Sequence, residues 1–174
     1  MISFEAIKLL ILDCDGVLSD GQIVYDANGV EAKSFSARDG LGLKLLEFTD
    51  IQVAVVTGRK SDILIQRCKD LNITNIHQGV RNKLVKVTKI LSAMNLTWEN
   101  VAYMGDDWND YPVLEKVALS SCPFNVAEDF KKRLDFVATH NGGDGAIRDL
   151  IEYILTKKGV YDKVIETYLD YLRS

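Results

Sequence analysis

The sequence has few of the residues that build disulfide frameworks or soft-metal sites. Its 174 residues include only 3 cysteines and 2 histidines. Cys14, Cys68 and Cys122 are widely separated, odd in number and without a CxxC spacing, so neither a disulfide framework nor a zinc site is expected. His77 and His140 lack metal-ligand spacing to another histidine or cysteine and are interpreted as structural or surface residues. This cysteine usage is typical of a reduced, cytoplasmic protein.

Long apolar runs and basic clusters are also missing. No stretch approaches the length of a membrane span, and the apolar run near the N-terminus is too short, and lacks the basic leader, for a signal peptide. The formal net charge is −4, and no Lys/Arg run offers a track for a nucleic-acid backbone. We therefore expect no membrane or nucleic-acid partner, but small molecules or other copies of this chain.

Hydrophobic residues are abundant, at 47% of the chain, which is enough for one domain with a full core over residues 1–174. Short apolar runs alternate with amphipathic segments, the rhythm of right-handed βαβ units. The pattern predicts an α/β fold with a Rossmann-like parallel sheet and helices on both faces. The expected strands cover residues 7–12, 51–56, 75–77, 101–104, 117–120 and 136–138.

Two carboxylates follow the first apolar run. Asp13 and Asp15 come directly after residues 7–12, and in an extended segment they point the same way because side chains repeat every second residue. Open α/β sheets bind ligands at the C-terminal ends of their strands, so we expect chemistry here. Taken alone, the pair also fits a strand end followed by an ordinary Asp-Gly turn.

A second acidic cluster, Asp106, Asp107 and Asp110, follows the apolar run 101–104. Bringing four or five carboxylates together is unfavourable without a compensating cation. An oxygen-only ligand set with no histidine or cysteine nearby suits Mg²⁺. The two clusters together predict a magnesium site.

Two other segments are predicted beside this site. Residues 21–36 alternate around Asn28-Gly29, a strong hairpin signal, and are expected to form a β-hairpin flap at the mouth of the site. Thr57 directly follows the expected strand 51–56. At this strand end its hydroxyl and nearby N–H groups are suited to holding a phosphoryl oxygen. The alternative is that Thr57 starts a turn or caps a helix at 61–71.

The C-terminal segment, residues 160–174, is predicted to be a helix with its apolar side chains on one face. Packing on the core of its own chain is the simpler interpretation. In a protein whose site is open, the helix is also able to help close the site of a neighbouring copy.

The motifs together resemble the haloacid dehalogenase-like phosphatases, and the resemblance spans most of the chain. Four motifs of that family are matched in order and spacing by Asp13-x-Asp15-Gly16, Thr57-Gly58, Lys83 and Gly105-Asp106-Asp107-x-x-Asp110. Some members insert a cap domain at the flap position, but the interval here is too short for one. The resemblance therefore implies a capless member with an open site, unless a neighbouring subunit covers it.

The resemblance implies an aspartyl-phosphate mechanism. Asp13 attacks the phosphorus, and Asp15 gives a proton to the departing alcohol and later takes one from water. Lys83 offsets the charge of the nucleophile and the phosphate. Mg²⁺ is held by the Asp13 carboxylate, the Asp15 backbone carbonyl and Asp106, with Asp107 and Asp110 in support.

A closer resemblance is to the 3-deoxy-D-manno-octulosonate 8-phosphate phosphatases, small Mg²⁺ enzymes of lipopolysaccharide precursor synthesis. The matching stretches are Asp13 to Gly21, Phe35 to Gly40, Thr57-Gly58-Arg59, Asn82-Lys83-Leu84 and Gly142-Gly143-x-Gly145-Ala146-x-Arg148. It implies a homotetramer in which a neighbour's hairpin helps build the site. It also implies that phosphate and substrate contact Gly16, Thr57, Gly58, Lys83, Arg38 and Arg59. Arginines at 38 and 59 suit a substrate with a carboxylate as well as a phosphate.

Two alternatives stay open. Similar small enzymes act on 9-phosphates of sialic-acid-type sugars, and a haloacid dehalogenase-like domain can also serve as a non-catalytic oligomerisation scaffold. None of the expected catalytic and metal-binding residues is missing, which argues against the scaffold. Asp144 stands where a basic residue is frequent in this branch, and Asp162 with Lys163 forms no clear neighbour-reaching motif. The pattern gives no reason for Cys14 between the two aspartates.

Overall fold

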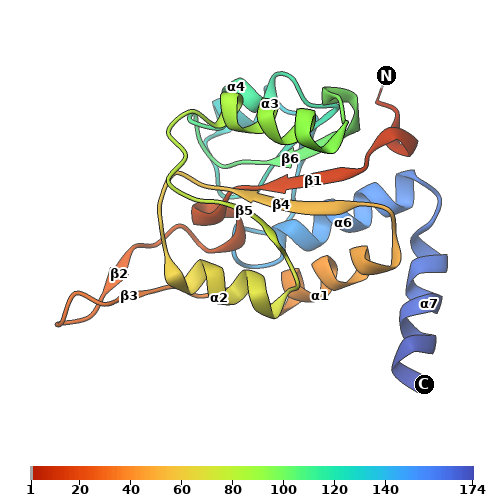
Figure 1. The fold of residues 1–174 in the computed structure, drawn as a ribbon, viewed down its shortest axis with the longest axis horizontal. Coiled ribbons are helices and arrows are strands. Elements are labelled where there is room, and N and C mark those ends of the chain that lie inside the picture. The colour runs from red at the N-terminus through yellow and green to blue at the C-terminus, as the bar shows by residue number, and fades with distance from the viewer. Residues whose placement is uncertain (1) are drawn as a thin grey trace.

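Six parallel strands form the central sheet of the computed structural model, which describes residues 2–174 (Figure 1). The strand order is β5-β4-β1-β6-β7-β8, and every neighbouring pair is parallel. The strands are β1 Leu9–Leu12, β4 Gln52–Val56, β5 Asn75–His77, β6 Val101–Met104, β7 Leu119–Cys122 and β8 Phe136–Val137. The predicted parallel sheet is confirmed.

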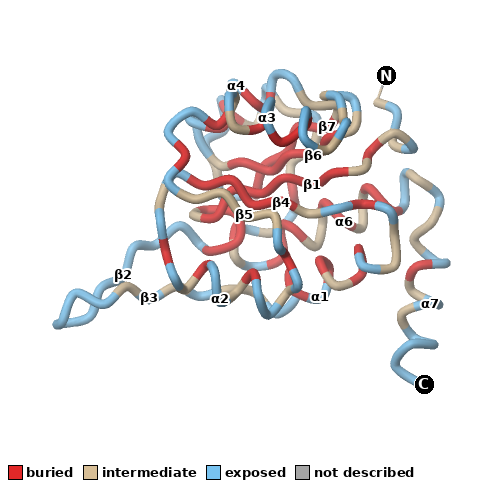
Figure 2. Tube along the Cα trace, viewed as in Figure 1, coloured by how far each residue is buried: buried red, intermediate tan, exposed pale blue. Residues whose placement is uncertain are grey.

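The register of the central strands fixes where their ends meet. Leu12, the last residue of β1, pairs with Val55 of β4 and with Met104 of β6. All four residues of β1 and of β6 are buried, as expected for parallel strands that are covered on both faces (Figure 2). The loops after β1, β4 and β6 therefore leave the sheet side by side.

Helices cover both faces of the sheet. Alternate side chains of β1 point to opposite faces and contact different sets of helices. Leu10 and Leu12 pack with α1, α2 and α6, whereas Leu9 and Ile11 pack with α3, α4 and α5. The helices are α1 Ala37–Leu45, α2 Asp62–Asp70, α3 Lys83–Met94, α4 Tyr111–Leu114, α5 Glu128–Lys131, α6 Ala146–Lys157 and α7 Tyr161–Arg173. The predicted three-layer arrangement is confirmed.

The start of α3 is fixed by local chemistry. The side chain of Asn82 accepts a hydrogen bond from the Val85 N–H at 3.0 Å, which satisfies one of the free donors of the first turn. Lys83 is therefore the first helical residue. The helix ends at Met94, and the next residue, Asn95, caps it with a left-handed backbone conformation.

The hairpin between β1 and α1 extends away from the body of the protein (Figure 1). Its strands, β2 Val24–Tyr25 and β3 Glu31–Ala32, are short and antiparallel. The Asp26 carboxylate accepts hydrogen bonds from the N–H groups of Asn28 and Val30, both at 2.8 Å, and so closes the turn. The flap predicted from Asn28-Gly29 is confirmed, although its paired part is shorter than expected.

The last helix, α7, packs at its start and is exposed at its end (Figure 2). Val164 is buried in the core beside α1 and α6, and Tyr168 packs edge-on against Phe48. Leu169 and Leu172 beyond them are exposed. Within residues 2–174, no helix combines the length and apolar character needed to cross a bilayer.

Candidate active site

Three carboxylates converge at the C-terminal edge of the sheet. Asp13 follows β1 directly, and Asp106 and Asp110 belong to the loop after β6. Oxygen atoms of these three side chains all lie within 4.8 Å of one another. Asp13 is 4% exposed and Asp110 is fully buried. Asp107, by contrast, is exposed and accepts a hydrogen bond from the Trp108 N–H at 2.8 Å, so its supporting role stays a prediction.

Burial and mutual repulsion act together on this cluster. Burial, and next the Asp110 charge, raise the pKa of Asp13 to about 6. Burial and the Asp13 charge raise the pKa of Asp106 to about 7. Lys83 opposes both effects without cancelling them. The site therefore carries more negative charge than the protein itself compensates.

Lys83 lies between two of the carboxylates. Its Nζ is 2.6 Å from Oδ1 of Asp110 and 3.0 Å from Oδ2 of Asp13, and the residue is 3% exposed. Burial opposes its charge, but the two carboxylates outweigh burial and hold its pKa above the ordinary value. The lysine is thus a fixed, desolvated cation beside the predicted nucleophile.

Asp110 holds Lys83 and the loop after β6 in place through hydrogen bonds. It accepts hydrogen bonds from Lys83, from the Tyr103 hydroxyl and from the Asp106 N–H, the last at 3.3 Å. A Cβ at Gly105 would lie 2.5 Å from the Asp110 Cβ, so a glycine is needed there. Asp110 therefore links the charge of Lys83 to the loop that carries Asp106.

The loop after β1 reaches the cluster because of Gly16. This residue has φ = +85°, and a Cβ there would lie 2.0 Å from Oδ2 of Asp106. Within the same loop, the Cys14 N–H donates to Oδ1 of Asp13 at 2.7 Å. The backbone thus holds one oxygen of the predicted nucleophile while Lys83 holds the other.

Thr57 lies at the same edge, buried after β4. Its N–H donates to the His77 carbonyl at 2.9 Å, so this group is not free for a phosphoryl oxygen. Its hydroxyl makes no hydrogen bond within the described part of the chain. The N-cap residue of α2 is Ser61, so Thr57 does not cap that helix. The hydroxyl and the exposed Gly58 remain the candidate phosphate contacts of this loop.

The Asp15 side chain is not part of the group of three carboxylates and contacts the hairpin instead. Lys33 of the hairpin contacts its Oδ1, and Nε of Arg59 lies 3.5 Å from its Oδ2. The Arg59 guanidinium also binds Glu31 of the hairpin at 2.5 Å. Lys33 and Glu31 were not expected from the sequence. Their spacing of two residues along the chain, which places side chains on one face of an extended segment, is the signal that was available.

Comparison with known proteins shows the family of this chain. Residues 70–150 match the haloacid dehalogenase-like hydrolase family. The chain is 44% identical over 159 residues to 3-deoxy-D-manno-octulosonate 8-phosphate phosphatase of Escherichia coli K12, covering 91% of this chain and 85% of that protein. The chain belongs to the haloacid dehalogenase-like hydrolases. The same-named phosphatase of Haemophilus influenzae is 41% identical over 170 residues, or 98% of this hydrolase and 94% of the relative.

Solved structures of the family have the same fold. The phosphatase of Moraxella catarrhalis, crystallised with magnesium, phosphate and the sugar acid KDO, superposes with a TM-score of 0.90 at 36% identity over 95% of each chain. The cobalt-bound Haemophilus influenzae enzyme gives 0.86 at 41% identity, over 91% of this chain and 92% of that one. The predicted family and fold are confirmed.

In this hydrolase, Gly142 and Gly143 pack against the loop after β1, which carries Asp13 and Asp15. A Cβ at Gly142 would lie 1.8 Å from the Gly16 carbonyl oxygen, and one at Gly143 would lie 2.5 Å from the Asp20 nitrogen. The buried Asp39 carboxylate accepts hydrogen bonds from the N–H groups of Gly145 and Arg148 at 3.1 and 2.9 Å. This holds the first turn of α6 against α1.

Arg38, predicted to contact substrate, is exposed in the first turn of α1. Its guanidinium carbon would lie 3.5 Å from a Cβ at Gly145, beside the His140 ring. The structure therefore puts Arg38 next to the glycine loop, residues 142–145, and its contact with substrate stays a prediction.

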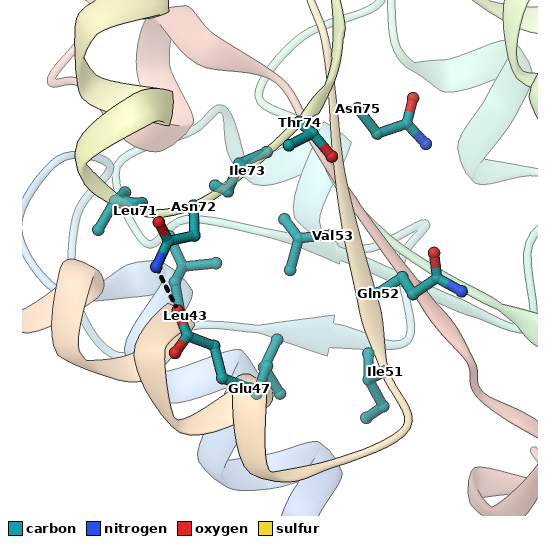
Figure 3. Close-up of a pocket in the computed structure, with 11 residues that line it drawn as sticks. Leu43, Glu47, Ile51, Gln52, Val53, Leu71, Asn72, Ile73, Thr74 and Asn75 are labelled. Carbon is teal, nitrogen blue, oxygen red and sulfur yellow. Dashed lines mark hydrogen bonds between the residues drawn. The ribbon is translucent and has the colours of Figure 1, made fainter.

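A cavity of about 210 Å³ lies near the N-terminal ends of β4 and β5 (Figure 3). The ends of α1 and α2 and the starts of β4 and β5 line it, and Asn72 donates to Glu47 at 3.0 Å across its rim. The cavity is thus remote from the carboxylates, which are at the C-terminal ends of the strands.

Proposed function

We propose that this hydrolase removes the phosphate from 3-deoxy-D-manno-octulosonate 8-phosphate, with Mg²⁺ as its cofactor, in lipopolysaccharide precursor synthesis. The observation that carries the proposal is the buried group of Asp13, Asp106 and Asp110 with Lys83 against it. It occurs in a chain 44% identical to the Escherichia coli phosphatase named for this substrate. The Moraxella catarrhalis relative contains magnesium, phosphate and the sugar acid together.

The donor set fits Mg²⁺. The three side chains offer only carboxylate oxygens, the ligands that this ion prefers, and the raised pKa values of Asp13 and Asp106 reflect an uncompensated negative charge. We assign the ion to the carboxylates of Asp13 and Asp106 and the Asp15 carbonyl, with Asp110 and Asp107 in support. When bound, the ion supplies positive charge that offsets the negative phosphoryl oxygens.

The reaction then proceeds in two displacements. A carboxylate oxygen of Asp13 forms a bond to phosphorus as the bond from phosphorus to the sugar oxygen breaks, and Asp15 gives its proton to that oxygen. Asp15, now ionised, takes a proton from the water that attacks the aspartyl-phosphate. Inorganic phosphate leaves and Asp13 is restored. Lys83 stabilises the charge that develops on the phosphoryl group in both steps.

Substrate contacts follow from the same edge of the sheet. Gly16, the Thr57 hydroxyl, Gly58 and Lys83 bind the phosphate. Arg38 and Arg59 bind the sugar-acid carboxylate, for which the fork of a guanidinium is well shaped. The position of Arg59 beside Asp15 supports this assignment.

We also propose that residues 1–174 form one phosphatase domain that works in the cytoplasm as a homotetramer. The hairpin supports an oligomer, because Ile23, Val24, Tyr25 and Val30 on it are between 49% and 62% exposed, an apolar surface suited to another copy. Light scattering over a dilution series, with activity measured in parallel, tests this. A fully active monomer would contradict a site shared between subunits.

The function is tested by phosphate release with Mg²⁺ from three kinds of substrate. These are the octulosonate 8-phosphate, a nine-carbon sialic-acid-type 9-phosphate and common hexose phosphates, compared by kcat/KM. A clear preference for the first is expected. Preference for the nine-carbon acid would keep the mechanism and change the pathway. No release from any of them would favour a non-catalytic scaffold.

A further inference from the structure

The Asp15 carboxylate belongs to a closed ring of alternating charges. Lys33 contacts Oδ1 of Asp15, and Arg59 Nε is 3.5 Å from Oδ2. Glu31 completes the ring, because its Oε1 is 3.4 Å from Lys33 Nζ and 2.5 Å from the Arg59 guanidinium. Two members come from the hairpin, one from the loop after β1 and one from the loop after β4.

Burial distinguishes Lys33 in this ring from an ordinary surface lysine. Its side chain is 1% exposed, whereas that of Arg59 is 37% exposed. Exposed ion pairs contribute little free energy to the folded state. Burying an ammonium group, by contrast, costs free energy unless carboxylates lie beside it. Lys33 is therefore committed to Asp15 and Glu31. Glu31 lies on β3 and Lys33 directly follows that strand, and from there Lys33 contacts Asp15 while Glu31 contacts Arg59.

The two oxygens of Asp15 are held differently. Oδ1 has the direct contact with Lys33, whereas the 3.5 Å separation from Arg59 is too long for a strong hydrogen bond to Oδ2. An acid/base group must lie within hydrogen-bond reach of the atom that it protonates. With Oδ1 anchored, Oδ2 is the oxygen that remains available for proton transfer.

We propose that Lys33 is a positioning residue, which anchors Oδ1 of Asp15 so that Oδ2 faces the leaving-group oxygen of the substrate. The hairpin thus helps to position Asp15 of its own chain. This inference rests on the proposed phosphatase function, in which Asp15 protonates the departing alcohol.

The test compares leaving groups that differ in their need for a proton. The sugar alkoxide needs one, whereas p-nitrophenolate departs from p-nitrophenyl phosphate without one. General acid catalysis contributes roughly 10²–10⁴-fold, so Lys33→Met is expected to lower kcat/KM for the sugar phosphate by about 10–100-fold. For p-nitrophenyl phosphate, kcat/KM, which reports only the steps up to phenolate release, is expected to change by less than a few-fold.

The controls separate positioning from a general effect on folding. Lys44 lies in the last turn of α1, its side chain is 36% exposed, and it is also paired with a carboxylate, that of Glu47. Lys44→Met is expected to leave both rates unchanged. Lys33→Arg retains a cation and should recover most of the sugar-phosphate activity. Retained activity on p-nitrophenyl phosphate shows that Lys33→Met is folded and keeps its nucleophile.

Equal losses on both substrates, no loss on either, or an arginine variant as impaired as the methionine variant would overturn the assignment. If the wild-type enzyme does not accept the octulosonate phosphate, the substrate proposal fails by itself. The same comparison is then made with whichever alkyl phosphate it does hydrolyse. A wild-type protein that hydrolyses neither alkyl nor aryl phosphates would overturn the function and the role of Lys33 together.

Discussion

Replacing Lys83 with methionine removes the ammonium group that lies between Asp13 and Asp110, 3.0 and 2.6 Å from their oxygens. Methionine keeps much of the side-chain volume, so the change is mainly one of charge. Three carboxylates would then share one buried site without their protein cation. Removal of one partner of a buried ion pair typically costs about 3–5 kcal/mol, and we expect a loss of that size in metal-free protein at pH 8.

The loss should depend on pH in a defined direction. The folded pKa values of Asp13, about 6, and Asp106, about 7, lie above the ordinary value of 3.8, so the folded protein binds these protons more tightly. Their contribution to stability is present below pH 4 and is lost as the pH rises through 6 to 7. Without Lys83 both pKa values rise further. The difference between variant and wild type should therefore shrink as the pH falls from 8 to 5.

Urea unfolding with a chelator at pH 8 and at pH 5 measures this difference. Lys89→Met, an exposed lysine on the same helix, is the matched control and should behave as wild type. Adding Mg²⁺ at pH 8 should recover part of the stability of Lys83→Met, while its turnover stays at least about 100-fold reduced. A loss below about 1 kcal/mol at pH 8, or one that is the same at both pH values, would refute the reasoning.

Three further predictions concern the same site. Asp13→Asn should abolish phosphate release yet raise metal-free stability at pH 8 by about 1–3 kcal/mol, as seen in urea unfolding, because a desolvated charge is removed; residual turnover would contradict its role as nucleophile. Mg²⁺ should stabilise the wild type by about 3 kcal/mol at 100 times its Kd at pH 8, and less at pH 5 where Asp106 is protonated; calorimetric scans with and without the ion measure this. Gly142→Ala should cost at least about 1–3 kcal/mol and most of the activity, because its Cβ meets the Gly16 carbonyl at 1.8 Å; a thermal melt and a phosphate assay unchanged from wild type would oppose the close packing.

Much of the fold could be predicted because its signals are local. The apolar run of β1 and the Asn28-Gly29 turn each specify their own structure, and parallel strands necessarily bring their carboxyl ends to one edge. Asp13 and Asp106 could be brought together for that reason, although they are 93 positions apart in the chain.

The parts that could not be predicted depend on orientation. The spacing of Glu31 and Lys33 indicates that they share a face of the hairpin. Which face turns toward Asp15 depends on the path of the chain at the base of the hairpin, so their partners could not be predicted. Tyr103 lies within an apolar strand and is typical of a core residue, yet its hydroxyl binds Asp110. Likewise Asp107 and Asp110 are alike in sequence, and only the turn after β6 decides which of them is buried.

The contact between the glycine loop and the loop after β1 has a consequence for folding during translation. Gly142 packs on Gly16, and the Asp39 carboxylate binds the N–H groups of Gly145 and Arg148, so the last quarter of the chain braces residues of the first quarter. A ribosome synthesises Asp13 and Asp15 early, but their loop gains this support only after α6 has been translated. The loop that carries Asp13 and Asp15 therefore gains its full set of contacts only after residues 142–148 have been synthesised.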